Sequence, residues 1–75
     1  MSSLDVREQL AVIKAIVEAR TEADVSQREL SMKLRKGPTF MQRIESGRRD
    51  VSIREFVRIA RALGMDPHDL LDRVL

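Results

Sequence analysis

The sequence contains no cysteine, tryptophan or tyrosine, and it has one histidine among its 75 residues. Without cysteine the chain can form neither disulfides nor thiolate metal sites, and nothing in the composition argues for an oxidising compartment. One histidine, no glycine-rich phosphate loop and no carboxylates at metal-ligand spacing leave the chain without a recognisable catalytic set. We therefore do not expect an enzyme, and we predict no cofactor and no metal site.

Long hydrophobic runs are missing as well. Apolar stretches such as Ala-Ile-Val at residues 15–17 are far too short to span a bilayer, and the opening residues lack the apolar core of a signal peptide. We therefore expect a cytoplasmic protein. Its length, with 43% hydrophobic and 35% charged residues, predicts one folded domain over residues 1–75. A core this small favours help from a partner or a second copy.

Charge is distributed unevenly along the chain. The formal net charge is only +2, but residues 27–49 hold seven cationic and two acidic side chains, which leaves the remainder at −3. One basic zone on an otherwise acidic chain is typical of a protein that binds a polyanion. Charge by itself is equally consistent with an arginine-rich surface that only contacts solvent.

Helix signals dominate, and the predicted fold class is all-α. In the first third of the chain, apolar residues recur at spacings of four, three and four, the period of one helix face. This stripe consists of Val6, Leu10, Ile13 and Val17.

The later helices are marked by their ends. The Ser-x-x-Glu pattern of a capping box occurs at residues 26–29 and 52–55, and Asp66-Pro67 is a variant of it. Gly47 and Gly64 follow apolar runs and are natural helix-terminating residues. The five helices predicted in this way span residues 4–23, 27–34, 38–46, 53–63 and 67–74.

The predicted core is mainly aliphatic, because the chain has only two phenylalanines and no larger aromatic residue. The side chains placed on inward helix faces are Ile13, Val17, Leu30, Leu34, Met41, Ile44, Ile53, Phe56, Val57, Ala60, Leu63 and Leu70.

Two of the predicted helices, 27–34 and 38–46, are short and joined by a turn of three residues, which is the helix-turn-helix arrangement. From about Ile13 to Leu71 the sequence resembles the phage-repressor and Cro-like, or XRE-type, helix-turn-helix family. The resemblance rests on Ser-Gln at residues 26–27, on Met-x-x-Ile-Glu-x-Gly at 41–47 and on Ala-Leu-Gly at 62–64. It implies a compact five-helix fold that binds DNA.

The resemblance also implies roles for individual residues. Arg20 and Glu45 match an ion pair that links the first helix to the third. Gln27 matches a phosphate-binding position at a helix start, where free N–H groups also favour anions. The residues that match base-facing positions are Pro38, Thr39, Gln42 and Arg43. Together with Gln27, the residues placed near the sugar-phosphate backbone are Arg35, Lys36, Phe40, Arg48 and Arg49.

Each of these residues also has a simpler interpretation. Gln27, Thr39 and Gln42 could be ordinary exposed positions of short helices, and Arg48 and Arg49 could be solvated loop charges. Phe40 could fill the core instead of turning its edge toward a sugar or a thymine methyl group. Arginine at position 43 is the side chain that pairs bidentately with guanine O6 and N7, which favours base reading there.

The turn departs from the family pattern. Arg35 stands where the family usually has glycine, and Lys36 stands where it usually has an apolar residue. Either Arg35 takes a left-handed conformation, at a cost of about 1 kcal/mol, or Gly37 absorbs the turn and the third helix begins at a different residue. The second outcome would change the roles of Pro38 and Thr39 more than that of Arg43.

The expected function is a sequence-specific double-stranded DNA-binding transcription regulator, a dimeric repressor or controller that acts on a palindromic operator. The last helix carries two apolar stripes, of which one can enter the core, so we place a homodimer interface at Leu71, Val74 and Leu75. The alternative is an antitoxin-like protein-interaction module whose contact patch includes Leu4, Leu71 and Leu75. Binding of single-stranded RNA is disfavoured, because only Phe40 could stack on a base.

Overall fold

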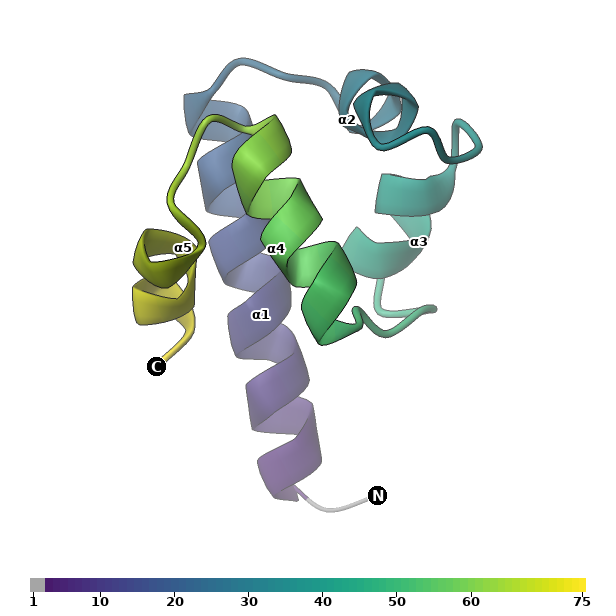
Figure 1. The fold of residues 1–75 in the computed structure, drawn as a ribbon. Helices are drawn as coiled ribbons and strands as arrows, with labels where there is room; N and C mark the ends of the chain where they lie inside the picture. The colour runs from purple at the N-terminus through teal and green to yellow at the C-terminus, as the bar shows by residue number, and fades with distance from the viewer. Residues whose placement is uncertain (1–2) are drawn as a thin grey trace.

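The computed structural model describes residues 3–75, with side chains from Val6 onward, and the secondary structure of this part of the chain is wholly helical (Figure 1). The all-α fold predicted from the sequence is confirmed. Leu4, a member of the expected contact patch, lies outside the described side chains. The helices are α1 (Ser3–Glu22), α2 (Gln27–Lys33), α3 (Phe40–Glu45), α4 (Ile53–Ala62) and α5 (Pro67–Val74).

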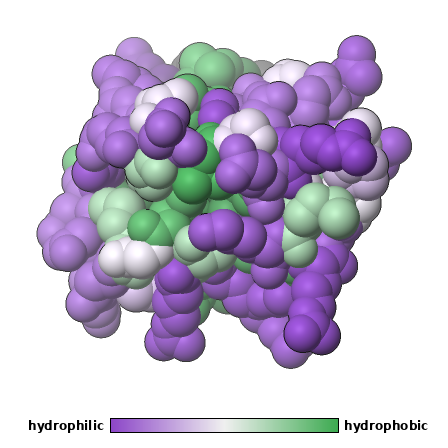
Figure 2. Space-filling model, turned by 90° about the horizontal axis from the view of Figure 1, so that it is seen from above, coloured by the Kyte–Doolittle hydropathy of each residue, from purple (hydrophilic) through white to green (hydrophobic). Residues whose placement is uncertain are grey.

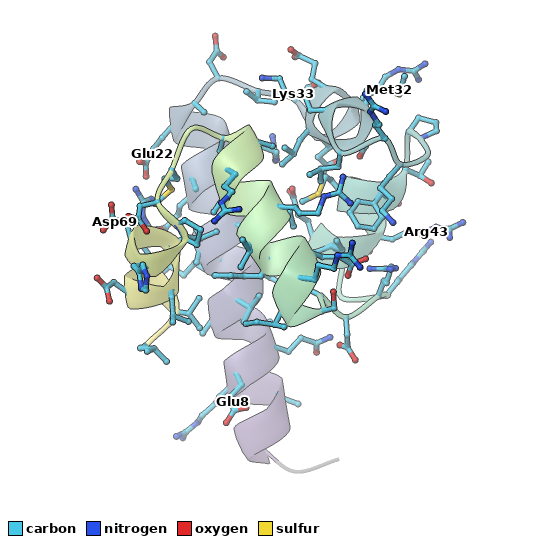
Figure 3. All side chains as sticks on the ribbon, in the orientation of Figure 1. Glu8, Glu22, Met32, Lys33, Arg43 and Asp69 are labelled. Atoms are coloured by element: carbon cyan, nitrogen blue, oxygen red, sulfur yellow. The ribbon has the colours of Figure 1, made fainter. Side chains whose placement is uncertain are left out.

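The long helix α1 organises the other four. Helix α5 packs along α1, and α4 packs against α5, while α2 and α3 lie together on the opposite side (Figure 1). The N-terminal half of α1, which carries Glu8, projects beyond the other helices (Figure 3). Within the described residues, no helix is long and apolar enough to cross a membrane.

The helix ends follow the predicted chemistry. Both capping boxes form, with the Glu29 N–H donating to Ser26 Oγ at 3.0 Å and the Glu55 N–H donating to Ser52 Oγ at 3.1 Å. Gly47 and Gly64 have φ values of +79° and +72°, in the left-handed region where a glycine avoids Cβ strain. Four of the five predicted helices agree with the observed bounds to within one residue.

Helix α3 begins later than predicted. The sequence placed Pro38 in its first turn, but Pro38 and Thr39 form a separate turn, closed by the Phe40 N–H donating to Gly37 O at 3.1 Å. Thr39 has φ −102° and ψ 7°, outside the range of a regular helix, so the continuous helical ladder starts at Phe40. Proline restricted the local backbone but did not begin the helix.

The core differs from the predicted one mainly in α1. The buried face of this helix is Ala15, Ile16 and Ala19, whereas Leu10 of the predicted stripe is 59% exposed. Ile13 and Val17 are only partly covered. The small side chains of Ala15 and Ala19 allow the other helices to approach α1 closely. The face of α1 that contains them is therefore buried, while the predicted stripe is only partly covered.

A similar correction applies to α4. Ile59 is fully buried, whereas Ile53, in the first turn, is 77% exposed, and Val57 and Leu63 are partly buried. Ile53 lies where α4 emerges from the loop, so no helix covers its side chain. The other predicted core residues are buried as expected: Leu30, Leu34, Met41, Ile44, Phe56, Ala60 and Leu70.

Candidate nucleic-acid interface

Helices α2 and α3 present one face to each other and the other to solvent. Leu30 and Leu34 of α2 pack with Met41 and Ile44 of α3 in the buried cluster. Because Met41 and Ile44 point inward, the intervening side chains must point outward. The exposed residues on this side include Pro38, Thr39, Gln42 and Arg43.

Arg43 extends away from the body of the protein (Figure 3). Neither Arg43 nor Arg48 takes part in any of the ion pairs found among the described residues. Other exposed cations flank them on α2 and in its turn, namely Arg28, Lys33 and Arg35. Figure 2 shows that the side formed by α2 and α3 is mostly hydrophilic, although Met32 of α2 is 58% exposed, whereas most apolar side chains gather nearer the centre of that view.

The C-terminal end of α3 is held by Glu45. Its carboxylate accepts bidentate bonds from Arg20 Nε and Nη2, both at 2.8 Å, so the predicted ion pair is present. The two side chains are 13% and 6% exposed, respectively. The hydrogen bond from the Arg20 guanidinium to Glu45 raises the pKa of Arg20. Because the pair is shielded from water, it fixes α3 against α1 with defined geometry.

Gln27 is directed differently from the prediction. Its amide nitrogen Nε2 donates to Glu45 Oε1 at 2.9 Å instead of pointing into solvent. Glu45 thus collects donors from α1 and from α2 at once. The role of Gln27 seen in the structure is to tie α2 to α3, although one amide hydrogen remains available.

Arg35 takes the strained conformation considered for it. Its φ is +58°, and Gly37 is not among the residues with positive φ. The Arg35 N–H donates to Met32 O at 2.9 Å and the Lys36 N–H donates to Ser31 O at 3.0 Å, the pair of bonds that closes a helix C-terminus in the Schellman motif. Arg58 of α4, which the sequence did not indicate, donates to Leu34 O at 3.0 Å and supports this turn.

Phe40 is buried, so its assignment to the backbone-contacting set is wrong, and the core alternative is correct. Its ring carries the Lys36 ammonium at 5.4 Å and the Arg49 guanidinium at 4.8 Å from the centroid. These cation–π contacts cover the ring with charge instead of leaving an edge free for a sugar.

Arg49 is also engaged within the protein. Its Nη1 and Nη2 donate to Glu55 at 2.9 and 2.8 Å, and Nη1 donates to Asp50 O at 3.1 Å. The pKa of Glu55 is lowered from 4.5 to about 2, mainly by these bonds from Arg49 and to a smaller extent by the bond from the backbone N–H of Ser52. Glu55 therefore caps α4 and anchors the loop after α3. Arg49, which the sequence placed near the sugar-phosphate backbone, is therefore exposed but already paired within the protein.

This arrangement matches known proteins. Residues 17–74 match the family described as the helix-turn-helix domain. A solved structure of an XRE-family-like protein from Pseudomonas syringae pv. tomato aligns with a TM-score of 0.83 and 31% identity over 93% of this chain and 84% of the other. The chain belongs to the XRE-type helix-turn-helix DNA-binding family.

Two further relatives of this XRE-type chain have names that state a regulatory role. The control protein C.BamHI of Bacillus amyloliquefaciens is 36% identical over 52 residues, which is 69% of this chain. The match spans only 64% of that relative's own length. The clp gene regulator ClgR of Corynebacterium glutamicum aligns with a TM-score of 0.80 and 28% identity, over 89% of this chain and 71% of ClgR.

Proposed function

We propose that this XRE-type domain binds double-stranded DNA in a sequence-specific manner and regulates transcription, with α3 placed in the major groove. The observation that carries the proposal is the contrast on α3 itself. Its inward side and its C-terminal Glu45 are held by other helices, while Arg43 projects outward and has no ion-pair partner among the side chains that the structure describes. A rigidly held helix with a free arginine is suited to reading base edges. The names of C.BamHI and ClgR, a control protein and a gene regulator, support a regulatory role.

Within this proposal the exposed side chains have two kinds of role. Arg43 donates to guanine O6 and N7, and Thr39 and Gln42 contact neighbouring base edges, with Pro38 at the rim. Arg35 and Arg48, on either side of α3, contact phosphates and position the helix. Gln27 can offer a phosphate only its second amide hydrogen. Lys36 and Arg49 contribute mainly through the packing of Phe40 and the loop.

The test separates base reading from phosphate binding. A preferred site is first selected from a random duplex pool, and affinities for it and for random duplex are then measured at several salt concentrations. Arg43→Ala should weaken the binding free energy for the selected site by roughly 1–3 kcal/mol. It should also reduce the ratio of the affinity for the selected duplex to that for random duplex. Arg48→Ala should weaken both equally and reduce the salt slope by about one.

Arg7→Ala provides the matched control, because Arg7 is an exposed arginine on the projecting half of α1. It should leave both affinities and the salt slope unchanged. Equal losses for Arg43→Ala on both duplexes would mean that α3 is only clamped to the backbone. No salt-dependent binding by the wild type would instead favour the protein-interaction alternative.

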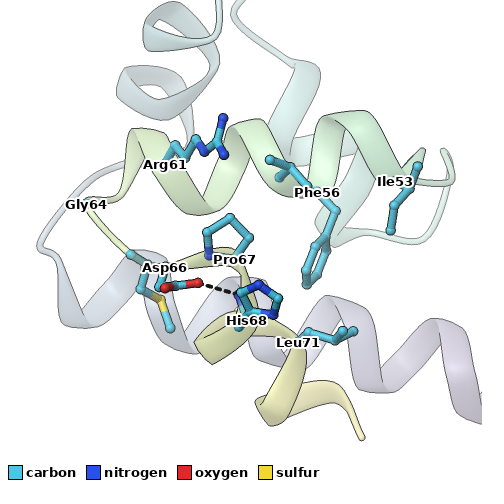
Figure 4. Close-up of a pocket in the computed structure, with 10 residues that line it drawn as sticks. Ile53, Phe56, Arg61, Gly64, Asp66, Pro67, His68 and Leu71 are labelled. Atoms are coloured by element: carbon cyan, nitrogen blue, oxygen red, sulfur yellow. Dashed lines mark hydrogen bonds between the residues drawn. The ribbon is translucent and has the colours of Figure 1, made fainter.

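We further propose that two copies associate through α4 and α5. An open groove of about 750 Å³ separates these helices, with Ile53 and Phe56 facing Leu71 across it (Figure 4). Leu71 and Leu75 are 38% and 91% exposed, whereas Val74 packs against the core and so leaves the expected interface set. Apolar surface of this kind on so small a domain is consistent with a covered interface.

The two helices also carry exposed charges of opposite sign. Arg54 and Arg61 lie on α4, and Asp69 and Asp72 lie on α5 together with Arg73, which is paired with Glu22; of these residues, Arg61 lines the groove. A two-fold arrangement can place the acidic α5 of one copy beside the basic α4 of the other. Two reading helices about 34 Å apart would then face half-sites of a palindromic operator.

Sedimentation at tens of micromolar tests this association. Leu71→Asp should give a monomer, because it puts a carboxylate into the apolar groove. Leu10→Asp introduces the same charge on exposed α1 and should remain dimeric. A monomeric wild type would contradict the dimer, and a monomer caused only by Leu10→Asp would move the interface to α1.

A further inference from the structure

The helix proposed to read DNA begins without a cap of its own. Thr39 precedes α3 but makes no side-chain hydrogen bond to its first turn, and Gly37 has no side chain to offer. The N–H groups of a first helical turn have no acceptor within the helix and must find one elsewhere. Phe40 uses Gly37 O, but the next residue, Met41, is fully buried and cannot donate to water.

Ser31 of α2 supplies the missing acceptor. The Met41 N–H donates to Ser31 Oγ at 3.0 Å, and the Ser31 hydroxyl donates to Gln27 O at 2.8 Å. Among the described residues, Ser31 is the only polar side chain in the fully buried set. Its bond to Gln27 O sets the direction of the hydroxyl, so that an oxygen lone pair faces α3.

We propose that Ser31 is the N-terminal cap of α3, provided from α2, and that it is a positioning residue for DNA reading. The inference rests on the proposed DNA-binding function. The two hydrogen-bond systems that hold α3 both pass through Gln27. Its carbonyl accepts the Ser31 hydroxyl that caps the start of α3, and its side-chain amide donates to Glu45 at the end. Residues that do not face DNA thereby set the angle at which Arg43 meets it.

A purely steric role makes a different prediction. If the contact between α2 and α3 needs only a small side chain at this point, alanine should serve as well as serine. If the hydroxyl acts as a cap, Ser31→Ala leaves the Met41 N–H buried without a partner. Ser31→Cys, whose sulfur is a weak acceptor, should satisfy the Met41 N–H less well than the wild-type serine and better than alanine.

The first experiment does not involve DNA. Native-state amide exchange of Met41, followed by NMR, should be roughly tenfold or more faster in Ser31→Ala than in the wild type, relative to the amide of Ile59 in the core of α4. Ser31→Cys should show a smaller increase. Unchanged Met41 protection in Ser31→Ala would overturn the proposed cap.

The second experiment measures the ratio of affinities for the selected duplex and for random duplex, at a temperature where every variant is folded. Ser31→Ala should lower this ratio by roughly tenfold, because α3 loses its fixed orientation, and Ser31→Cys should lower it less. Ile16→Val is the control, since it removes a buried methylene from α1 without touching the cap. It should reduce stability and keep the ratio.

The outcomes separate the two proposals. A wild-type protein that shows no preference for any duplex overturns the DNA-reading function, while Met41 exchange still decides whether Ser31 is the cap. A wild-type protein that discriminates, together with a Ser31→Ala variant of unchanged ratio, leaves the function standing and overturns the positioning role. The same ratio loss in Ile16→Val would assign the effect to stability and also overturn that role.

Discussion

On the α2–α3 side of the molecule, directed polar bonds are added to aliphatic packing, whereas the α1, α4 and α5 side relies mainly on aliphatic packing, with an exposed ion pair between Glu22 and Arg73. On the first side, Glu45, Gln27 and Ser31 fix α3 at both ends. On the second side, Leu70 and Ile16 are fully buried, and an open groove lies between α4 and α5. Hydrogen bonds define an angle, which a reading helix requires, while apolar contacts are non-directional and suit association with another surface.

The largest effect should come from the packed side. Leu70→Ala removes a fully buried side chain and should destabilise the protein by roughly 4 kcal/mol, because a cavity adds to the lost transfer energy. Leu71→Ala, at the neighbouring but exposed position, should cost less than about 1 kcal/mol in the monomer. Denaturant unfolding at low protein concentration measures both. Similar losses for the two variants would mean that Leu71 is covered in the monomer.

Glu45→Ala should have the second-largest effect on stability, and it should act on the α2–α3 side. It leaves Arg20 and Gln27 without their acceptor at a shielded site, which should cost roughly 3 kcal/mol of unfolding free energy and reduce duplex binding. Glu18→Ala is the control, because its pair with Lys14 is solvent-exposed and should change stability by less than about 0.5 kcal/mol. An unaltered melting temperature for Glu45→Ala would show that polar bonds do not hold α3.

The bond between Arg49 and Glu55 predicts a smaller, pH-dependent effect. The folded-state pKa of Glu55 is lowered to about 2. The ionised Glu55 therefore stabilises the folded state fully above pH 4.5, and this stabilisation is lost as the pH falls through about 2. We expect the lowered pKa of Glu55 to contribute roughly 2 kcal/mol to the free energy of unfolding, after allowing for the partly exposed arginine. Urea unfolding from pH 6 to 2 should therefore show a weaker acid dependence in Glu55→Gln.

Glu22→Gln is the comparison on the packed side. Glu22 pairs with Arg73 between α1 and α5, and the hydrogen bond from Arg73 lowers its pKa, but the carboxylate is 60% exposed. Glu22→Gln should change the loss of stability at low pH less than Glu55→Gln does. The reverse order would assign the greater electrostatic contribution to the α1–α5 contact.

The smallest expected effect is a gain in stability at the turn. Arg35→Gly should relieve the cost of a left-handed arginine and stabilise the protein by up to about 1 kcal/mol. It should also weaken binding to every duplex, because a cation is lost. Gly64→Ala, at a similar φ with no nearby atoms to clash, should destabilise by about 1 kcal/mol in thermal unfolding. A stabilising Gly64→Ala would show that φ does not control either turn.

The amino-acid sequence by itself determined the five helices, although it placed the start of α3 two residues early, and it left the conformation of the turn between α2 and α3 open. Capping boxes at Ser26 and Ser52 act over three residues, so they could be found without knowledge of the fold. The alternation of inward Met41 and Ile44 with outward Gln42 and Arg43 is likewise a local property of one helix. The Arg20–Glu45 pair, 25 residues apart, was anticipated only through the family resemblance.

Tertiary structure decided what depends on distant partners. Helix α1 has two apolar faces, and only packing against the other helices selected Ala15 and Ile16 over Leu10 as the buried one. Arg49 pairs with Glu55 because that carboxylate lies within reach, and Ser31 accepts the Met41 N–H because Met41 is folded against it. The physical reason is the same in each case. A polar or apolar group takes the partner that burial brings to it, and sequence spacing does not specify which partner that is.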